Sequence, residues 1–428
     1  MKNFKKFRKA AALVLTAGVL MGTISGCGSS DGGVSDTKRG EKTSDDKVEK
    51  VSLKVWIPEE EMEITQKMCD EFNAAYAEYD CTFDVAVVGV DEAADNLTTD
   101  PELAADVFLM PSGSISQLTD AGLLYPITIN GDEVKALYDE SAVDACTKDG
   151  HLYGVPHSPN SFFMFYNKSM YTEDEVKSLD TMMAKDLGKD VYNFSFSVHD
   201  SWYLEAFFLG AGCTLFGKDG KDPTDCTWNN ENGVAAANYV IDLVKNPKYI
   251  EDKDGVAGSL MKEGKLGALC SGTWSADALS KALGDDFGAC ALPTINLNGK
   301  DCQLSNFADY KCFAVKSNTA SPKAAQLLAE WLANEKNQLT RFMEKEVKAT
   351  PTCLSLQDNE AVVADPAASA LMEQAQYATL QPSISQIANY WTPVATLGES
   401  ILQGDVTSAN VQKNLDTVVD TILSSLTE

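Results

Sequence analysis

The 428-residue sequence is poor in histidine and lacks paired cysteines, two features from which metal centres are often built. It contains only three histidines, and its eleven cysteines are scattered singly, with no C-x-x-C pair. This spacing disfavours a metal cluster and forms no disulfide framework, so we expect mostly buried free thiols. Neither the zinc-protease motif H-E-x-x-H nor the P-loop motif occurs. No metal and no cofactor are therefore expected.

Positive charge is also scarce. The chain has 35 Lys and Arg residues against 63 Asp and Glu residues, a formal net charge of −28. Such a protein would repel the phosphates of nucleic acid, so nucleic acid is not expected as a partner. The net charge gives no information about whether the protein binds a neutral ligand. Beyond the N-terminus the sequence lacks a long apolar run free of charge, so we expect no membrane span in its main body.

The N-terminus has the pattern of an export signal. A start rich in lysine and arginine precedes an apolar stretch at residues 10–24, which is too short to cross a bilayer as a helix. The stretch ends in Ile24-Ser25-Gly26-Cys27, which resembles the bacterial lipobox, although the usual motif has Leu where Ile24 stands. The resemblance implies a lipoprotein signal peptide at residues 1–26 and a lipid on Cys27. An ordinary signal peptide followed by an unrelated cysteine is the alternative.

Residues 27–50 consist mostly of Gly, Ser, Asp, Lys and Glu. Such a polar segment cannot bury enough apolar surface to offset the entropy of ordering it. We expect a flexible tether with an r.m.s. reach of roughly 25 Å. Two lipid chains on Cys27, at ~0.8 kcal/mol per buried methylene, would hold the protein on the outer face of the cell membrane.

The main body alternates short β patterns with amphipathic helical patterns, which is typical of a layered α/β protein. Residues 51–57 alternate as a strand, and residues 60–78 carry an apolar face with i, i+4 spacing. Ser321-Pro322 is a helix start, and a last helix is predicted from near Thr407. Further strands are predicted at residues 81–88, 107–110, 162–166, 266–270, 287–291 and 312–315.

Several stretches, in order along the body, resemble the extracellular solute-binding protein family that includes the maltose-binding proteins. The stretches are residues 53–57, 105–108 with 121–127, 148–156 leading to 165–168, 261–265 through 272–274 to 291–294, and 382–387 with 390–391. Each stretch alone is a weak signal. Together they cover nearly the whole body, so the sequence is identified as a member of this family.

The resemblance implies a periplasmic-binding-protein-like (type II) α/β fold, with two lobes, three hinge crossings and a ligand cleft between them. The crossings are expected near residues 156–160, 293–298 and 348–351, each beside a proline. The N-terminal lobe would then comprise residues 51–157 plus 299–348. The C-terminal lobe would comprise residues 158–298 plus 349–428.

The same resemblance implies a monomeric, lipid-anchored, substrate-binding protein of an ABC transporter. It would capture an oligosaccharide, with malto-oligosaccharide favoured, and deliver it to the permease subunits. A sugar site needs flat aromatic rings for the apolar faces of the ligand and polar side chains for its hydroxyls. The aromatic candidates that match family segments are Trp274, Trp391, Trp202, Tyr390 and Tyr203. Each of them could instead be a core residue, Tyr203 most readily.

The polar candidates follow from the same matches. Asp200 stands before a helix, where it could bind ligand, cap the helix, or do both. Glu60 and Glu61 follow the first strand, where their charge would equally complement the helix dipole. Asn160 replaces a carboxylate of the family at the first crossing, and His157 beside it could be purely structural.

One position departs from the family. Met110, followed by Ser112 two residues on, stands where the maltose-binding protein has a cleft tryptophan. Methionine can line a pocket but stacks less rigidly than an indole. Trp56, Trp228 and Trp331 are assigned to packing or surface.

Three alternatives stay open. A different glycan or a polyamine could be the ligand, because acids and aromatics together also hold cations. An extracellular glycosidase would need two carboxylates across the scissile bond, and Asp200 with Glu60 or Glu61 could form such a pair. Anionic ligands are disfavoured, because the matched positions carry no arginine.

Overall fold

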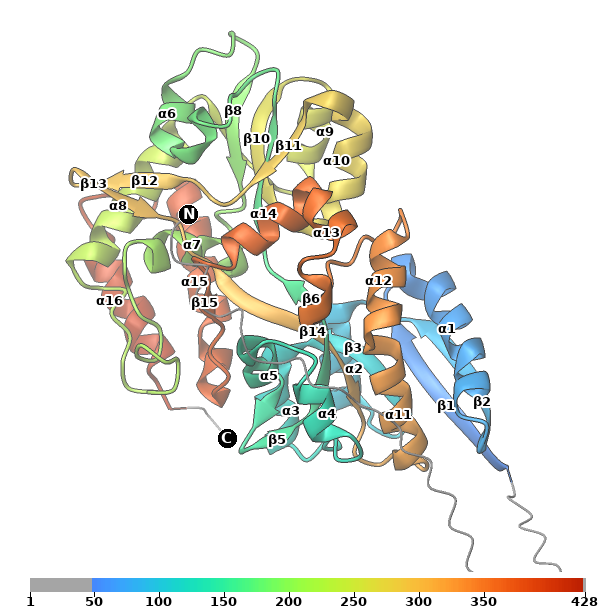
Figure 1. The fold of residues 1–428 in the computed structure, drawn as a ribbon. Helices are drawn as coiled ribbons and strands as arrows, with labels where there is room; N and C mark the ends of the chain where they lie inside the picture. The colour runs from blue at the N-terminus through green and yellow to red at the C-terminus, as the bar shows by residue number, and fades with distance from the viewer. Residues whose placement is uncertain (1–47, 426–428) are drawn as a thin grey trace, which may run out of the picture. The chain divides into compact units, whose positions relative to one another are not determined.

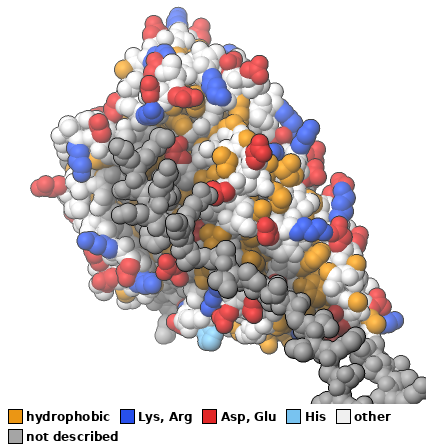
Figure 2. All heavy atoms as spheres, viewed as in Figure 1, with side chains coloured by type: hydrophobic (Ala, Val, Ile, Leu, Met, Phe, Trp, Pro, Cys, Tyr) orange, Lys and Arg blue, Asp and Glu red, His pale blue; other side chains and the backbone are white. Residues whose placement is uncertain are grey.

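The computed structural model describes residues 48–425, so the predicted signal peptide, Cys27 and nearly all of the predicted tether lie outside the described residues. Within this part of the chain every helix is too short or too polar to cross a membrane. On the face drawn in Figure 2, acidic and basic side chains are interspersed rather than gathered in one patch.

The first sheet contains six strands in the order β15-β14-β3-β1-β2, with β6 also paired to β14. Strands β1, β2 and β3 are parallel, whereas β14 runs antiparallel to β3 and β6. The bounds are β1 Glu49–Ile57, β2 Tyr79–Val87, β3 Val107–Pro111, β6 Gly154–Asn160, β14 Phe307–Val315 and β15 Thr379–Leu380. The alternating pattern of β1 places Val51, Leu53, Val55 and Ile57 in the core, which confirms the predicted strand.

The second sheet has five strands in the order β11-β7-β10-β8-β9. Strands β8, β9 and β10 are parallel, and β7 is antiparallel to its neighbours. The bounds are β7 Phe163–Asn167, β8 Tyr192–Phe196, β9 Tyr249–Glu251, β10 Leu266–Ser271 and β11 Phe287–Cys290. Strands β7 and β10 at the centre of this sheet are buried along their whole length, as expected for strands covered on both faces.

Helices cover both sheets (Figure 1). Around the first sheet are α1 Met62–Ala75, α2 Ala93–Thr99, α3 Ile115–Asp120, α4 Gly131–Lys135, α5 Glu140–Ala145, α11 Pro322–Ala333 and α12 Glu335–Met343, with the short strands β4 Thr147–Lys148 and β5 His151–Leu152. Around the second are α6 Leu179–Ala184, α7 Ser201–Gly210, α8 Glu231–Lys245, α9 Val256–Lys262, α10 Ala276–Leu283, α13 Glu360–Ala364, α14 Pro366–Gln374, α15 Trp391–Gln403 and α16 Val411–Ile422. The last helix begins at Val411, a few residues after the predicted start near Thr407.

The chain passes between the two sheets at separate points. It leaves β6 of the first sheet at Asn160 and starts β7 of the second at Phe163. The return passes through a hairpin, β12 Thr294–Leu297 with β13 Lys300–Gln303, before β14 begins at Phe307. The chain therefore joins the first sheet later than residues 293–298, where the second crossing was predicted. Figure 1 shows the long strand β14 that completes this passage.

Candidate functional site

A cavity of 860 Å³ is lined by side chains that follow the carboxyl ends of strands from both sheets. Ligands of open α/β sheets bind in this kind of crevice, because the loops that leave parallel strands meet there. The lining residues are Pro58, Glu60, Gly89, Val90, Asp91, Pro111, Gly113, Ser114, Gln117, Asn160, Asp200, Trp202, Tyr203, Trp274, Asp309, Lys311, Gln381, Ile387, Ala388, Trp391 and Thr392. Seven of the twelve predicted ligand residues are among them.

Two tryptophans form one aromatic wall of this cavity. The ring centroids of Trp202 and Trp391 lie 6.4 Å apart with their planes inclined at 33°, and both side chains are partly buried. Phe307 packs behind them, with ring centroids 6.1 Å from Trp202 and 6.4 Å from Trp391. Because neighbours hold both indoles, their remaining faces form a rigid apolar surface towards the cavity.

Trp274 forms a separate aromatic platform. It lies in the short 3-10 helix Thr273–Ser275, directly after β10, and is 49% exposed, which is unusual for a tryptophan. The Nζ atom of Lys311, on β14 of the other sheet, lies 6.0 Å from the centroid of the Trp274 ring. An exposed indole beside a cavity offers its apolar face to a ligand.

The tyrosines next to these tryptophans face the core to different degrees. Tyr203 reaches the cavity, but its ring also packs on Phe162 at 4.5 Å, and burial raises the pKa of its hydroxyl. Tyr390 is fully buried and donates a hydrogen bond to the backbone oxygen of Ser201 at 2.8 Å. Tyr390 therefore lies in the core and does not line the cavity. Trp228, one of the three tryptophans assigned to packing or surface, is fully buried.

The two adjacent glutamates separate. Glu60 is exposed and lines the cavity. Glu61 is only 3% exposed and lines a smaller hollow of 280 Å³ that shares Glu60 with the cavity. The Oε2 atom of Glu61 lies 2.9 Å from Nε of the fully buried Arg341. Burial favours the neutral carboxyl, but the contact with His157 and the positive charge of Arg341 outweigh it and hold the pKa of Glu61 at about 2. Glu61 thus compensates a buried charge and leaves Glu60 as the glutamate that faces the cavity.

His157 belongs to the same buried cluster. Its Nε2 atom lies 3.4 Å from Oε2 of Glu61, its ring packs on Phe313 at 5.2 Å, and only 1% of its surface is exposed. Burial lowers the pKa of the ring, which favours its neutral form. His157 lies outside the cavity lining, in a structural position.

Asp200 and Asn160 both lie on the cavity. The side chain of Asp200 accepts a hydrogen bond from the Trp202 amide at 2.8 Å, so it caps helix α7 while it lines the cavity. Asn160 donates from Nδ2 to Oδ2 of Asp309 at 2.8 Å.

Met110 and Ser112 do not line the cavity. Met110 is fully buried in β3, and the Ser112 hydroxyl, also buried, donates to Oδ1 of Asp309 at 2.5 Å. Pro111, Gly113 and Ser114 line the cavity in their place. Side chains alternate between the two faces of a strand, so Pro111 faces the cavity while Met110 faces the core.

Several cavity residues were not predicted from the sequence, and Asp309 and Lys311 are the most informative of them. The predicted strand covered only residues 312–315, whereas β14 starts at Phe307. A signal was present, because polar Asp309 and Lys311 alternate with apolar residues in a period of two. Residues two apart in a strand share a face, which brings both charges to the cavity.

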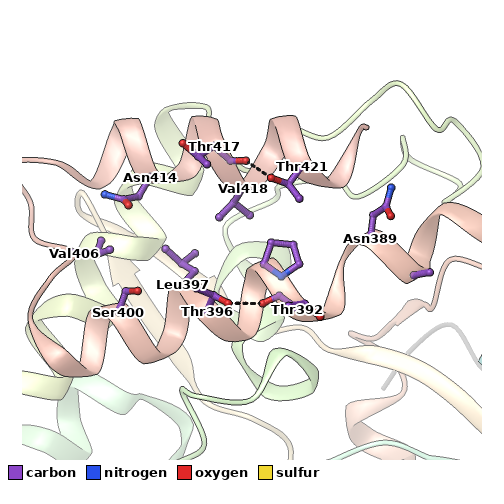
Figure 3. A pocket seen from close by; sticks show the side chains of 12 residues that line it. Asn389, Thr392, Thr396, Leu397, Ser400, Val406, Asn414, Thr417, Val418 and Thr421 are labelled. Atoms are coloured by element: carbon purple, nitrogen blue, oxygen red, sulfur yellow. Dashed lines mark hydrogen bonds between the residues drawn. The ribbon is translucent and has the colours of Figure 1, made fainter. Parts of the chain in front are cut away.

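A second hollow, of 510 Å³, lies between α15 and α16 and contains none of the predicted ligand residues (Figure 3). The hydroxyls of Thr396 and Thr421 there donate to backbone oxygens of their own helices. Throughout residues 48–425, no group of three or more His, Cys, Asp and Glu side chains is placed to hold a metal ion.

Comparisons with known proteins agree with this architecture. Residues 67–370 match a family described as bacterial extracellular solute-binding protein. The chain is 30% identical to the galactooligosaccharide-binding protein of Bacillus subtilis (strain 168), over 97% of each chain. It is 28% identical to the maltodextrin-binding protein MdxE of the same strain, over 69% of this chain and 72% of that one.

Solved structures show the same fold. Maltodextrin-binding protein MalE1 from L. casei BL23 superposes with a TM-score of 0.79 at 27% identity, over 87% of this chain and 99% of that one. A cyclo/maltodextrin-binding protein complexed with maltotetraose gives a TM-score of 0.75 at 24% identity, over 92% of this chain and all of that one.

Proposed function

This chain belongs to the bacterial extracellular solute-binding protein family, and from that premise we propose that it captures a neutral oligosaccharide outside the cell for an ABC transporter. The observation that supports this most directly is the cavity itself. It combines an aromatic wall, Trp202 with Trp391, and the exposed indole of Trp274 with a rim of carboxylates. Stacked rings hold the apolar faces of sugar rings, and carboxylates accept hydrogen bonds from sugar hydroxyls.

The charge of the cavity favours a neutral sugar over an acidic one. Among residues 48–425, four carboxylates line it, those of Glu60, Asp91, Asp200 and Asp309, and Lys311 is the one cationic side chain that does so. An anionic ligand would need paired cations, and preferably arginine. We propose malto-oligosaccharides as the first candidate class, in line with the maltodextrin-binding relatives. Galacto-oligosaccharides are the second, because a galactooligosaccharide-binding relative matches nearly the whole chain.

The proposed ligand residues are the predicted ones that line the cavity: Trp202, Trp274, Trp391, Tyr203, Asp200, Glu60 and Asn160. The protein would pass the bound sugar to the permease subunits of the transporter. It would act as a monomer, held at the outer face of the cell membrane by the lipid on Cys27. Replacing Cys27 by Ala should move the protein from the membrane fraction into the medium. The relatives are binding proteins rather than enzymes, so we expect no glycan cleavage on long incubation.

Calorimetric titration tests the proposal. Maltotriose, maltotetraose, galacto-oligosaccharides and spermidine form the panel, and micromolar affinity, ~−8 kcal/mol, is expected for one of the sugar series. Trp274→Ala and Trp391→Ala should each weaken binding more than tenfold. Trp331→Phe is the matched control, because Trp331 lies on helix α11 away from the cavity. If both alanine variants stay folded and bind within twofold of wild type, the site is misplaced. Binding of spermidine alone would refute the sugar proposal.

A further inference from the structure

Asp309 is a buried carboxylate at the floor of the cavity. It is 2% exposed, yet it lines the cavity beside Asn160. Its Oδ1 atom accepts hydrogen bonds from the Ser112 hydroxyl at 2.5 Å and from the Gly113 amide at 3.0 Å. Its Oδ2 atom accepts one from Nδ2 of Asn160 at 2.8 Å. The side chain therefore joins the end of β3, the end of β6 and the start of β14.

The directions of these hydrogen bonds are fixed by chemistry. The Gly113 amide can only donate, and an ionised carboxylate can only accept. The Ser112 hydroxyl accepts from the Tyr310 amide at 3.2 Å, so its own proton is free to point at Asp309. All three partners thus donate to Asp309. Asn160 must turn its NH₂ group towards Asp309 and its carbonyl oxygen the other way.

The carbonyl oxygen of Asn160 is therefore the atom available to a ligand. Within residues 48–425 no side chain or backbone group donates a hydrogen bond to it. We propose that Asp309 is a positioning residue that orients the Asn160 amide, so that the Asn160 carbonyl oxygen accepts a hydrogen bond from a hydroxyl of the bound sugar. The inference rests on the proposed function and adds to it one specific acceptor and the residue that fixes it.

An isosteric substitution should reverse this polarity. In Asp309→Asn, the new carbonyl oxygen has to face the Gly113 amide, which can only donate. The new NH₂ group then faces Asn160, which must rotate to present its own oxygen. The cavity would meet an NH₂ donor where the wild-type protein has an acceptor. The sugar hydroxyl that donated to Asn160 loses its acceptor, with no change in side-chain volume.

Exchanging the two residues should restore the acceptor. In the double variant Asp309→Asn/Asn160→Asp, the NH₂ group of residue 309 donates to one carboxylate oxygen of residue 160, and the second oxygen faces the cavity. The net charge of the protein equals that of wild type. Asn160→Asp alone would place two carboxylates at hydrogen-bonding distance, which is repulsive.

The experiment is a titration of the full-length wild type and of each variant with the maltotriose or galacto-oligosaccharide that binds best. We expect Asp309→Asn to weaken binding about tenfold, the size of one lost hydrogen bond. The exchange variant should return to within threefold of wild type. The matched control is Asp91→Asn/Asn160→Asp, because Asp91 lines the same cavity without a hydrogen bond to Asn160. It should bind no better than Asn160→Asp alone. Urea unfolding of each variant accompanies the titration.

The outcomes separate this inference from the proposed function. If the wild-type protein binds no sugar, the proposed function itself fails. If wild type binds and Asp309→Asn binds within twofold of it, Asp309 does not orient a ligand acceptor. An exchange variant as weak as Asp309→Asn alone overturns the inference as well. Should Asp309→Asn fail to fold, the exchange variant alone tests the inference. Its affinity can return to within threefold of wild type only if an acceptor faces the cavity again.

Discussion

Replacing Glu61 by Gln should destabilise the protein strongly while leaving ligand binding intact. Arg341 is fully buried, and Glu61 is the acidic side chain with which it forms an ion pair. The other guanidinium contacts are neutral: Nη1 donates to the backbone oxygen of Leu332 at 2.5 Å and Nη2 to the Thr65 hydroxyl at 3.2 Å. Glu61→Gln keeps the shape of the side chain but leaves the buried charge uncompensated.

Two routes give a similar magnitude for this loss. Removing one partner of a buried ion pair costs about 3–5 kcal/mol, because the remaining charge stays desolvated. The pKa of Glu61 is lowered from 4.5 to about 2, which corresponds to ~3 kcal/mol in favour of the charged form. We therefore expect a loss of about 3 kcal/mol at pH 7. Removing both charges, as in Glu61→Leu/Arg341→Met, should recover much of it, since apolar replacements of buried pairs are often neutral.

The loss should also depend on pH in a defined direction. The pKa of Glu61 is lower in the folded protein than in the unfolded chain, so its contribution is complete above pH ~4.5. It disappears as the pH falls from there towards 2, where the folded protein also takes up the proton. The difference in unfolding free energy between wild type and Glu61→Gln should therefore be constant from pH 7 to 5 and shrink below that range.

Urea unfolding followed by tryptophan fluorescence measures this difference. Glu60→Gln is the matched control, because Glu60 is the exposed neighbour on the same turn and lines the cavity. It should change the unfolding free energy by less than ~0.5 kcal/mol and weaken sugar binding instead. The reasoning is refuted if Glu61→Gln and Glu60→Gln unfold at the same urea concentration with the same slope.

Three further outcomes follow from the described packing. Tyr390→Phe removes the hydrogen bond to the Ser201 backbone, so it should lower the free energy of unfolding in urea by about 1–3 kcal/mol and leave sugar affinity within threefold of wild type. A large loss of affinity without destabilisation would place Tyr390 in the ligand site after all. Gly398→Ala brings a Cβ atom to 2.0 Å from the Val198 backbone oxygen and should lower the free energy of unfolding by about 1–3 kcal/mol. Its control, Gly258→Ala, adds a Cβ atom in open space on α9 and should be neutral or stabilising by up to ~1 kcal/mol. Equal effects of the two variants on thermal unfolding would contradict this. A thiol reagent at neutral pH should modify the partly exposed Cys302 before the eight buried cysteines, as peptide mass spectrometry can show. Early labelling of Cys69, whose pKa burial raises to about 12, would argue against the described core.

Much of the fold follows from local patterns that the sequence displays openly. The alternation of residues 51–57 predicts β1, and the continuous apolar runs predict β3, β7, β10 and β11 within a residue of their ends. Each of these patterns depends only on the period of the backbone and on which residues are apolar. The family resemblance extended this to the two-sheet architecture, and the matches to known proteins confirm it.

Adjacent residues with similar chemistry could not be separated in this way. Glu60 and Glu61 are the same residue type, and Tyr390 and Trp391 are both aromatic. Glu60 and Trp391 nevertheless line the cavity, whereas Glu61 and Tyr390 are buried. Which one turns inward depends on its partner, Arg341 for Glu61 and Ser201 for Tyr390. Those partners lie far away along the chain.

Local periodicity suffices to predict strands such as β1, β3, β7, β10 and β11, because it depends on neighbouring residues alone. The polarity of the site depends instead on contacts between distant segments, as Asp309 illustrates. Its carboxylate meets Ser112, Gly113 and Asn160 only after β3, β6 and β14 have paired. Hydrogen-bond direction depends on which donors surround an acceptor, and that neighbourhood exists only once distant strands lie side by side.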